Sequence, residues 1–192
     1  MKKWILVLLC LCLTGCSQPQ KEVYPETEEQ EQVSFVNPDP ADMSGYAGFT
    51  DQEHAYIEIT LEESLNKARK EEDFVIYYGN DHCPWCTEMV PVLNEVAKEE
   101  KVLIYYVDTS KPSNYSEDLY NRLLQLFGDM LEMDEDGVRN FFVPDVAVVK
   151  EGTVVMNHIA TVDTHDPYEK PMTGKERKQL KEIYAEMIAQ VK

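Results

Sequence analysis

Positive charge is scarce in this chain of 192 residues. Lys and Arg together number 18, whereas Asp and Glu number 36, so the formal net charge is −18. A protein that binds nucleic acid needs a basic face, and no basic cluster stands out along this chain. The composition therefore argues against nucleic acid as a partner, and it is typical of a soluble, self-repelling surface.

Apolar runs that could cross a membrane are also missing. The run at residues 4–13 is far shorter than the roughly 20 residues that a transmembrane helix needs, and it follows two lysines, which is typical of a secretory signal. It ends in Leu-Thr-Gly-Cys at residues 13–16, which resembles the lipobox of bacterial lipoproteins; the alternative is an ordinary signal peptide with an incidental cysteine. The resemblance implies removal of residues 1–15, a lipid on Cys16 and a location at the extracytoplasmic face of the cell membrane.

Cysteine is rare as well. The chain has five cysteines, of which Cys10 and Cys12 would leave with the signal peptide and Cys16 would carry the lipid. Cys83 and Cys86 then remain as the thiols of the mature chain. Outside the cytoplasm, a lone pair of thiols can cycle between dithiol and disulfide.

The segment that follows Cys16 has little apolar periodicity. Residues 17–53 carry one basic residue, Lys21, against nine acidic ones. Such a composition cannot bury enough apolar surface to order itself. We therefore expect a lipidated, acidic and flexible linker over residues 16–53, with Tyr46 and Phe49 as candidates for docking, and a folded domain over residues 54–192.

Strands and helices alternate from residue 55 onward. The continuous apolar runs at 73–79 and 102–108 are typical of strands buried on both faces, and 55–60 alternates as a strand does. Capping boxes at Thr60 and Thr173 mark two helix starts. Further elements are a helix after the cysteine pair, a helix at 116–127, and a hairpin at 146–150 and 154–160. This order predicts an α/β fold with a central mixed sheet flanked by helices.

The two remaining thiols lie in the motif Cys-Pro-Trp-Cys at residues 83–86. Structural zinc needs four ligands, and the mature chain has no second Cys-x-x-Cys, so we expect no metal. A static disulfide here would close a very small loop and stabilise little. Redox exchange fits better, because Cys83 would lie at a helix N-terminus, where the backbone N–H groups and the helix dipole stabilise a thiolate. Cys83 would attack, and Cys86, one turn further on, would resolve the mixed disulfide.

Residues 74–108 resemble the thioredoxin superfamily, with a strand, Cys-Pro-Trp-Cys, a helix carrying Pro91, and another strand. The stretch FFVPDVAVVKEGTVV at 141–155 resembles the family segment built around a cis-proline, with Pro144 in that position. The resemblance implies a thioredoxin fold and thiol–disulfide oxidoreductase activity on protein disulfides or dithiols. It also implies no cofactor, a cis bond after Val143, pairing of the Val143 backbone with substrate, and a contact surface at Trp85.

Within the superfamily, the chain is most similar to small Gram-positive thioredoxin-like lipoproteins of the bacteriocin transport accessory type. Stretches such as IYYGNDHCPWC and VPVLNEV carry that similarity. Three functions stay open. The first is an oxidoreductase with a membrane electron donor or acceptor as its partner, and the second is a non-catalytic binding module for an export system. The third is a reductase that serves a metal- or haem-handling pathway.

The chain departs from thioredoxin at the groups that handle protons. Tyr77 replaces a buried aspartate and Ile104 replaces a lysine, so proton transfer at Cys86 needs water or another group, such as Asp81, His82 or Glu88.

The dipeptide between the cysteines also departs from the thioredoxin pattern. Pro-Trp replaces Gly-Pro, as in more oxidising families, so we expect a reduction potential above about −270 mV.

The segment 110–142 is longer than in minimal thioredoxins. Its acidic stretch at 131–137 lacks the full ligand set of a calcium loop, which predicts a solvated loop.

Overall fold

The computed structural model describes residues 35–192. The expected signal peptide, the lipidation site Cys16 and the first part of the expected linker lie outside the described residues. Within the described range, no helix combines the length and the apolar character needed to cross a bilayer.

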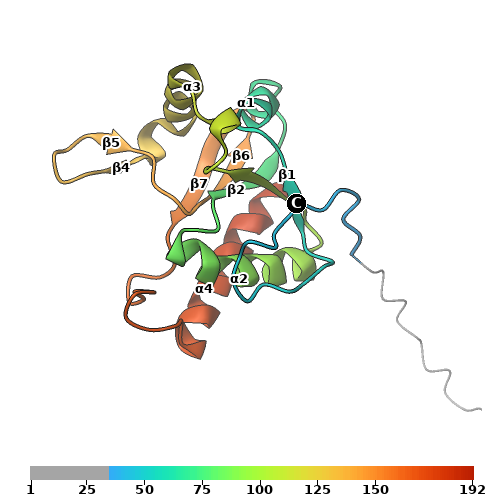
Figure 1. The fold of residues 1–192 in the computed structure, drawn as a ribbon. Helices are drawn as coiled ribbons and strands as arrows, with labels where there is room; N and C mark the ends of the chain where they lie inside the picture. Colours follow the sequence, from blue (N-terminus) through green and yellow to red (C-terminus); the bar gives the residue numbers. More distant parts are fainter. Residues whose placement is uncertain (1–34) are drawn as a thin grey trace, which may run out of the picture. The chain divides into compact units, whose positions relative to one another are not determined.

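A five-stranded mixed sheet forms the centre of the molecule (Figure 1), in the order β1–β3–β2–β6–β7. β1 and β2 both run parallel to β3, whereas β6 runs antiparallel to β2 and to β7. The continuous apolar runs occupy the inner strands, because an inner strand is covered on both faces. The strands are β1 (Tyr56–Glu58), β2 (Phe74–Gly79), β3 (Ile104–Asp108), β6 (Asp145–Lys150) and β7 (Thr153–Ile159).

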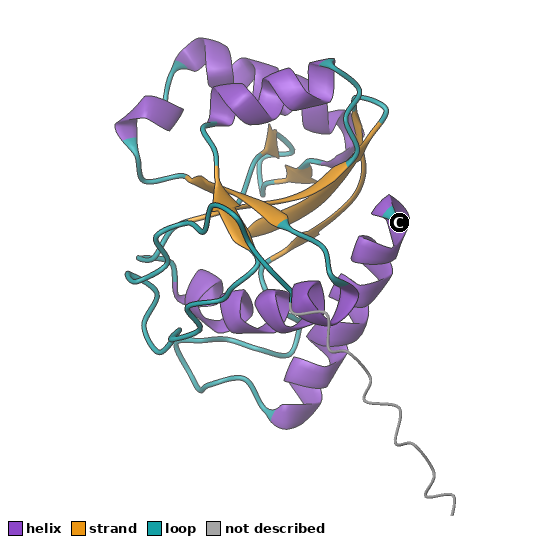
Figure 2. Ribbon diagram, turned by 90° about the vertical axis from the view of Figure 1, so that its right-hand side faces the viewer, coloured by secondary structure: helices purple, strands orange, loops and turns teal. Residues whose placement is uncertain are grey.

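Helices cover both faces of the sheet (Figure 2). α1 (Leu61–Arg69) and α3 (Glu117–Phe127) pack on one face, and α2 (Pro84–Glu100) and α4 (Gly174–Ile188) pack on the other. Each face has its own apolar core, and alternate residues of the strands point into one core or the other. This architecture confirms the predicted mixed sheet flanked by helices, which is the thioredoxin fold. Short 3₁₀ turns complete it at Pro112–Asn114, Gly128–Met130 and Ala189–Val191.

Both predicted capping boxes are present. The Thr60 side chain accepts the N–H of Glu63, and the Glu63 carboxylate accepts the N–H of Thr60 at 2.7 Å. Thr173 and Glu176 repeat this arrangement at the start of α4. Each box satisfies N–H groups that have no partner inside the helix, so these sequence signals fix where α1 and α4 begin.

The segment 35–53 packs against the domain, which differs from the expected flexible linker. Ala41, Met43 and Tyr46 are buried in the core beneath α2, and Phe49 packs against the same core. The backbone N–H of Ala41 donates to the carbonyl of Tyr56 on the edge strand β1 at 2.9 Å. The compact unit therefore begins near residue 34. The prediction missed this because only a few apolar side chains of the segment pack on the core, and the local sequence does not show that contact.

The acidic stretch within 131–137 forms part of a hairpin rather than only a loop. β4 (Glu132–Met133) pairs with β5 (Arg139–Asn140) in a separate two-stranded sheet that projects from the body (Figure 1). The Asp134 carboxylate accepts the N–H groups of Asp136 and Val138 at 3.0 and 2.8 Å. This carboxylate thus closes a turn, which is the usual structural use of Asp in that position.

Candidate redox site

The turn between β2 and α2 places the first cysteine. Strand β2 ends at Gly79, and the Asn80 side chain then holds the turn, because its Oδ1 accepts the His82 N–H at 3.1 Å and its Nδ2 donates to Thr109 Oγ1 at 3.0 Å. The chain enters α2 through Cys83 as the N-cap, followed by Pro84 at the first helical position. A proline there has no N–H to leave unsatisfied, so it favours this start of the helix.

The sulfur of Cys83 acts as the helix cap. It accepts the backbone N–H of Cys86 at 3.2 Å. Hydrogen bonding with Cys86, through its thiol and its backbone, lowers the pKa of the Cys83 thiol to about 7. No acidic residue occupies the first turn of α2, so the positive end of the helix dipole is not compensated there. Cys83 is half-buried, which leaves its sulfur open to an incoming disulfide.

Cys86 lies one turn further on and is completely buried. Burial, together with the hydrogen bond to Cys83, raises the pKa of its thiol well above the usual range. The two thiols are both reduced in this structure. The pair is therefore asymmetric, with one accessible sulfur that favours the thiolate and one enclosed sulfur that favours the thiol.

The loop before β6 lies beside Cys83. The Val143–Pro144 peptide bond is cis, as the resemblance implies, and Pro144 is buried. The Cys83 thiol donates to the Val143 carbonyl at 4.0 Å. The structure thus brings Cys83, Cys86, Val143 and Pro144 together from two distant parts of the sequence.

Trp85 is partly covered on the side of the site that faces the 161–172 loop. Its ring meets the ring of Tyr168 edge-on, with the centroids 5.2 Å apart, and Tyr168 is itself 74% exposed. The Met172 N–H donates to Glu88 Oε2 at 3.2 Å and ties this loop to α2. The expected contact surface at Trp85 is therefore shared with Tyr168, which no motif in the sequence singles out.

The three groups expected to handle the Cys86 proton are engaged elsewhere. Asp81 Oδ1 lies 3.2 Å from His82 Nδ1 at the surface, and Glu88 accepts the Met172 N–H. Tyr77 is buried in the same core as Cys86, and its hydroxyl is hydrogen-bonded to the hydroxyl of Tyr46 at 3.0 Å. Tyr77 thus occupies the position of the missing aspartate with a neutral phenol in place of a carboxylate.

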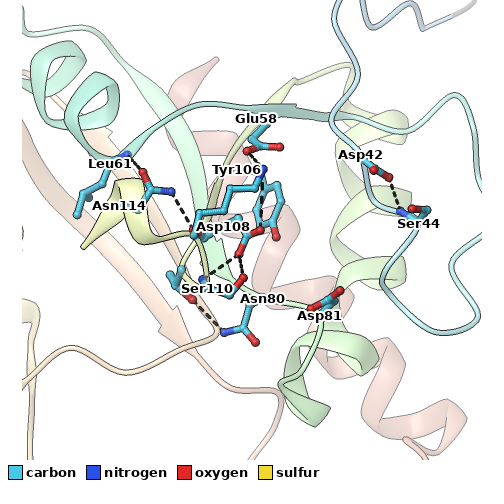
Figure 3. A network of polar contacts seen from close by, with 12 residues as sticks. Asp42, Ser44, Glu58, Leu61, Asn80, Asp81, Tyr106, Asp108, Ser110 and Asn114 are labelled. Atoms are coloured by element: carbon cyan, nitrogen blue, oxygen red, sulfur yellow. Dashed lines mark hydrogen bonds and ion pairs between the residues drawn. The ribbon is translucent and has the colours of Figure 1, made fainter. Parts of the chain in front are cut away.

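A cavity of about 230 Å³ opens on the other side of the cis-proline loop. Val143 connects the cavity to the redox site, because it lines the cavity and its carbonyl faces Cys83. Asn114 holds one wall in place, since its side chain accepts the Leu61 N–H and donates to the Asp108 carbonyl (Figure 3). The other lining residues are mainly apolar and come from α1, β2, the end of β3 and the 110–142 segment: Leu61, Tyr78, Val107, Thr109, Tyr115, Tyr120, Leu123 and Phe141.

Residues 35–192 contain no group of three or more His, Cys, Asp or Glu side chains placed to hold a metal ion. In the β4–β5 turn, the Asp134 carboxylate is used in backbone hydrogen bonds.

Neither a protein-family model nor a curated protein matches this chain. Among solved structures, it is similar to thioredoxin O2 from Arabidopsis thaliana, with 18% identity and a TM-score of 0.39 over 62% of this chain and 91% of that one. It is also similar to thioredoxin F from spinach chloroplast, with 19% identity and a TM-score of 0.38 over 55% and 74%. A mutant thioredoxin from Halobacterium salinarum NRC-1 shows 15% identity and a TM-score of 0.40 over 73% and 96%. Likeness at this level carries no argument about function, so the thioredoxin fold rests on the strand order and directions given above.

Proposed function

We propose that this protein is a thiol–disulfide oxidoreductase that acts on protein disulfides or dithiols through Cys83 and Cys86. The observation that carries the proposal is the asymmetry of the two thiols. Cys83 is accessible and caps a helix, and its pKa is lowered to about 7, whereas Cys86 is enclosed within one turn of it. An attacking sulfur needs access and thiolate character, and a resolving sulfur needs only to reach its neighbour.

In the reducing direction, the Cys83 thiolate attacks one sulfur of a substrate disulfide. The new bond joins Cys83 to that sulfur, and the other substrate sulfur leaves as a thiolate and takes up a proton. Cys86 then loses its proton and attacks Cys83 Sγ, which forms the Cys83–Cys86 disulfide and releases the second substrate thiol. Two electrons pass from the protein dithiol to the substrate, and the oxidising direction is the same sequence reversed.

Two features support a polypeptide as the substrate. The Val143 carbonyl beside Cys83 is a backbone acceptor of the kind that an extended peptide can pair with. The apolar cavity that Val143 also lines can take a large side chain from the same peptide. Glutathione has no large apolar side chain to place in this cavity, so exchange with a peptide that has one should be the faster reaction.

The cellular setting is a further part of this proposal. The lipobox-like residues 13–16 support a lipid anchor on Cys16 at the extracytoplasmic face of the cell membrane, and a membrane electron donor or acceptor would then turn the thiol pair over. The narrower likeness to bacteriocin transport accessory proteins stays a prediction from sequence.

A direct test uses a cysteine-containing peptide carried as a mixed disulfide with glutathione. The wild-type protein should release glutathione, and Cys86→Ser should instead accumulate a covalent adduct at Cys83 that mass spectrometry detects. Cys83→Ser should form no adduct. If Cys83→Ser and wild type react alike, the assignment of the attacking sulfur is wrong.

A non-catalytic binding module is the second candidate, and the 110–142 segment favours it. Tyr115, Met133, Val138 and Phe142 are large apolar side chains that lie at least 40% exposed there. Exposed apolar side chains gathered in one segment often mark an interaction surface. The Cys83→Ser/Cys86→Ser double variant separates the two candidates in cells, because an oxidoreductase loses its function and a binding module keeps it.

A further inference from the structure

The loop between β7 and α4 presents an aromatic side chain beside the redox site. Tyr168 in this loop is 74% exposed, and its ring meets the ring of Trp85 edge-on, with the centroids 5.2 Å apart. Trp85 lies in the first turn of α2, two residues after the attacking sulfur of Cys83. The loop lies next to the start of α2 (Figure 1), and the Met172 N–H ties the two together through Glu88. The two rings thus border the place where a substrate approaches Cys83.

Hydrogen bonds within the loop hold Tyr168 in place. The buried His165 ring spans the loop, because Nδ1 lies 2.7 Å from Thr161 Oγ1 and Nε2 lies 3.2 Å from the Lys170 carbonyl oxygen. The Asp166 carboxylate accepts the Tyr168 N–H at 2.8 Å, and the Asp166 carbonyl accepts the Lys170 N–H at 3.2 Å. A side chain on a backbone that is already ordered loses less freedom when it binds a ligand, so Tyr168 is placed in advance for contact.

Acidic side chains surround the two rings. The segments 80–88 and 161–172 together contain five Asp or Glu residues, whereas Lys170 is their one Lys or Arg. The Lys170 ammonium lies 3.6 Å from the Glu176 carboxylate, so its charge is already balanced. Asp163 and Glu169 are exposed on the same loop as Tyr168. The surface around the rings therefore carries negative charge that a cationic ligand would complement.

Aromatic rings among carboxylates favour one class of side chain. The ammonium of Lys or the guanidinium of Arg is attracted to the face of a Tyr or Trp ring, and the neighbouring carboxylates add to this attraction. The same carboxylates would repel an acidic side chain. An apolar side chain would contact the rings but would gain nothing from the charges. A cation is therefore the side chain that uses both properties of this surface.

A substrate peptide that reacts at Cys83 can reach this surface. An extended backbone advances about 3.3 Å per residue, and the charged groups of Lys and Arg lie at the ends of long side chains. A Lys or Arg within roughly three residues of the reacting cysteine would therefore come within reach of Trp85 and Tyr168. The Val143 carbonyl, which faces Cys83, can pair with the backbone of the same peptide.

We propose that Trp85 and Tyr168 form a binding surface for a Lys or Arg side chain close to the reacting cysteine, and that the preferred substrates are basic polypeptides. The inference rests on the proposed function and names the class of its substrates. Tyr168 is then a substrate-binding residue that sets specificity, and the acidic residues of the loop attract the peptide toward the site. Attraction between exposed charges weakens in salt, so the preference should fall as ionic strength rises.

The test compares three glutathionylated peptides that differ only in the residue next to the cysteine, which is Arg, Gln or Glu. The rate of each peptide with the protein is divided by its rate with dithiothreitol, which corrects for the reactivity of the peptide itself. The Arg peptide should exchange about two- to fivefold faster than the Gln peptide, as expected from one exposed cation–π contact, and the Glu peptide should be the slowest. Equal rates for the Arg and Gln peptides would overturn the inference.

Tyr168→Leu isolates the contribution of the ring. Leucine keeps an apolar side chain at this exposed position and removes the aromatic face. The preference for Arg over Gln should largely disappear, while the rate of the Gln peptide should change little. Tyr115→Leu is the matched control, because Tyr115 is also a highly exposed tyrosine but lies at the cavity instead of the 161–172 loop. It should keep the preference, and a loss in both variants or in neither would contradict the role of Tyr168.

A second pair of variants tests the carboxylates. Asp163→Asn/Glu169→Gln should reduce both the preference for Arg and its dependence on salt. Glu182→Gln/Glu186→Gln changes the net charge by the same amount further along α4, and it should leave both quantities unchanged. Equal effects of the two double variants would show that the net charge of the whole molecule selects the peptide, and not the loop beside Trp85.

A binding measurement separates this inference from the proposed function. In a chain that starts at residue 35, and so contains the compact unit, Trp85 is the only tryptophan, and its fluorescence reports on this surface alone. The Arg peptide with Ser in place of cysteine should change this fluorescence in a saturable way, and the Glu peptide should not. Binding without any disulfide exchange would refute the proposed function and leave the binding surface standing. Exchange without a preference for Arg, and without a change in fluorescence, would refute the inference and leave the function standing.

Discussion

At the scale of single residues, the Cys83 sulfur occupies a place that an oxygen usually holds. Ser, Thr, Asp and Asn are the common N-caps, and here the Cys83 sulfur accepts the Cys86 N–H at 3.2 Å instead. The cap bond grows stronger when the sulfur is ionised, because the acceptor then carries a charge. The hydrogen bond with the Cys86 thiol contributes most to the lowered pKa of Cys83, and the bond that caps α2 adds to it.

This coupling predicts how Cys83 responds to pH. Its pKa is lowered to about 7, below the ordinary value of about 8.5 for a thiol. The rate of Cys83 alkylation should therefore rise with pH to a midpoint near 7, as a stopped-flow titration of the reduced wild-type protein would measure, because Cys86 is completely buried and is needed for the hydrogen bond that lowers the pKa of Cys83. A midpoint near 8.5 would show that the hydrogen bonds from Cys86 do not activate the Cys83 thiol.

The same shift links pH to stability. Between about pH 7 and 8.5, Cys83 binds fewer protons in the folded than in the unfolded protein. Its contribution to the free energy of unfolding therefore grows as pH rises through this window, and it is lost as pH falls through 7. Denaturant unfolding of the reduced protein at several pH values would measure it. Cys83→Ser is the control, because serine keeps a cap and does not titrate here.

Gly79 gives a third prediction at the residue scale. A methyl group at this position would lie 2.4 Å from Cζ of the buried Tyr77 ring, which is too close for two carbon atoms. Gly79→Ala should therefore lower the free energy of unfolding by about 1–3 kcal/mol, the usual cost of overpacking a core. The double variant with Tyr77→Ala should cost less than the sum of the two changes, since the clash is removed. Additive costs would contradict the close approach.

At the scale of elements, the 110–142 segment builds a wall of the cavity next to Val143. α3 contributes Leu123, which is buried at the cavity, whereas Leu119 lies one turn earlier on α3 and does not line it. The cavity measures about 230 Å³, which is enough to hold a large apolar side chain. The 110–142 segment thus helps to form a pocket that can bind a side chain of the substrate.

Filling this cavity should change substrate choice. Leu123→Phe should slow exchange with a peptide that has Leu or Phe near its cysteine by several-fold, and it should leave exchange with glutathione disulfide unchanged. Leu119→Phe, on the same helix, is the control and should leave both rates alone. Equal effects on peptide and glutathione would show that the cavity does not contact the substrate.

At the scale of the whole molecule, the N-terminal segment is part of the fold. Ala41, Met43 and Tyr46 contribute to the core beneath α2, and each large apolar side chain that is fully buried adds about 1.5–3 kcal/mol. A chain that starts at residue 50 should therefore lose on the order of 5 kcal/mol of unfolding free energy relative to one that starts at residue 35. Urea unfolding of the two chains measures this, and equal stabilities would contradict the packing.

Much of this arrangement could be predicted from sequence, because it follows from local patterns. The runs in β2 and β3 are continuous and apolar, the capping boxes at Thr60 and Thr173 are complete, and the Cys83–Cys86 spacing fits one helical turn. Pro144 was placed by resemblance, and its cis bond is present.

The parts that could not be predicted depend on contacts between distant segments. Tyr46 sits in an acidic segment whose average composition hides a few core residues, and its partners Tyr77 and Tyr106 lie on two different strands. The sequence of β2 does not show that the Tyr77 hydroxyl meets the hydroxyl of Tyr46, which is 31 residues away in the chain. The two short strands β4 and β5 are too short to give a periodic signal.

The most direct test of the central claim is the reduction potential of the Cys83–Cys86 pair. It can be measured on a chain that starts at residue 35, in which these are the only cysteines, by equilibration with glutathione buffers. An oxidoreductase with Pro-Trp between its cysteines should give a reversible two-electron couple above about −270 mV. If no reversible couple is found, the thiols do not exchange electrons and the binding module is the better account.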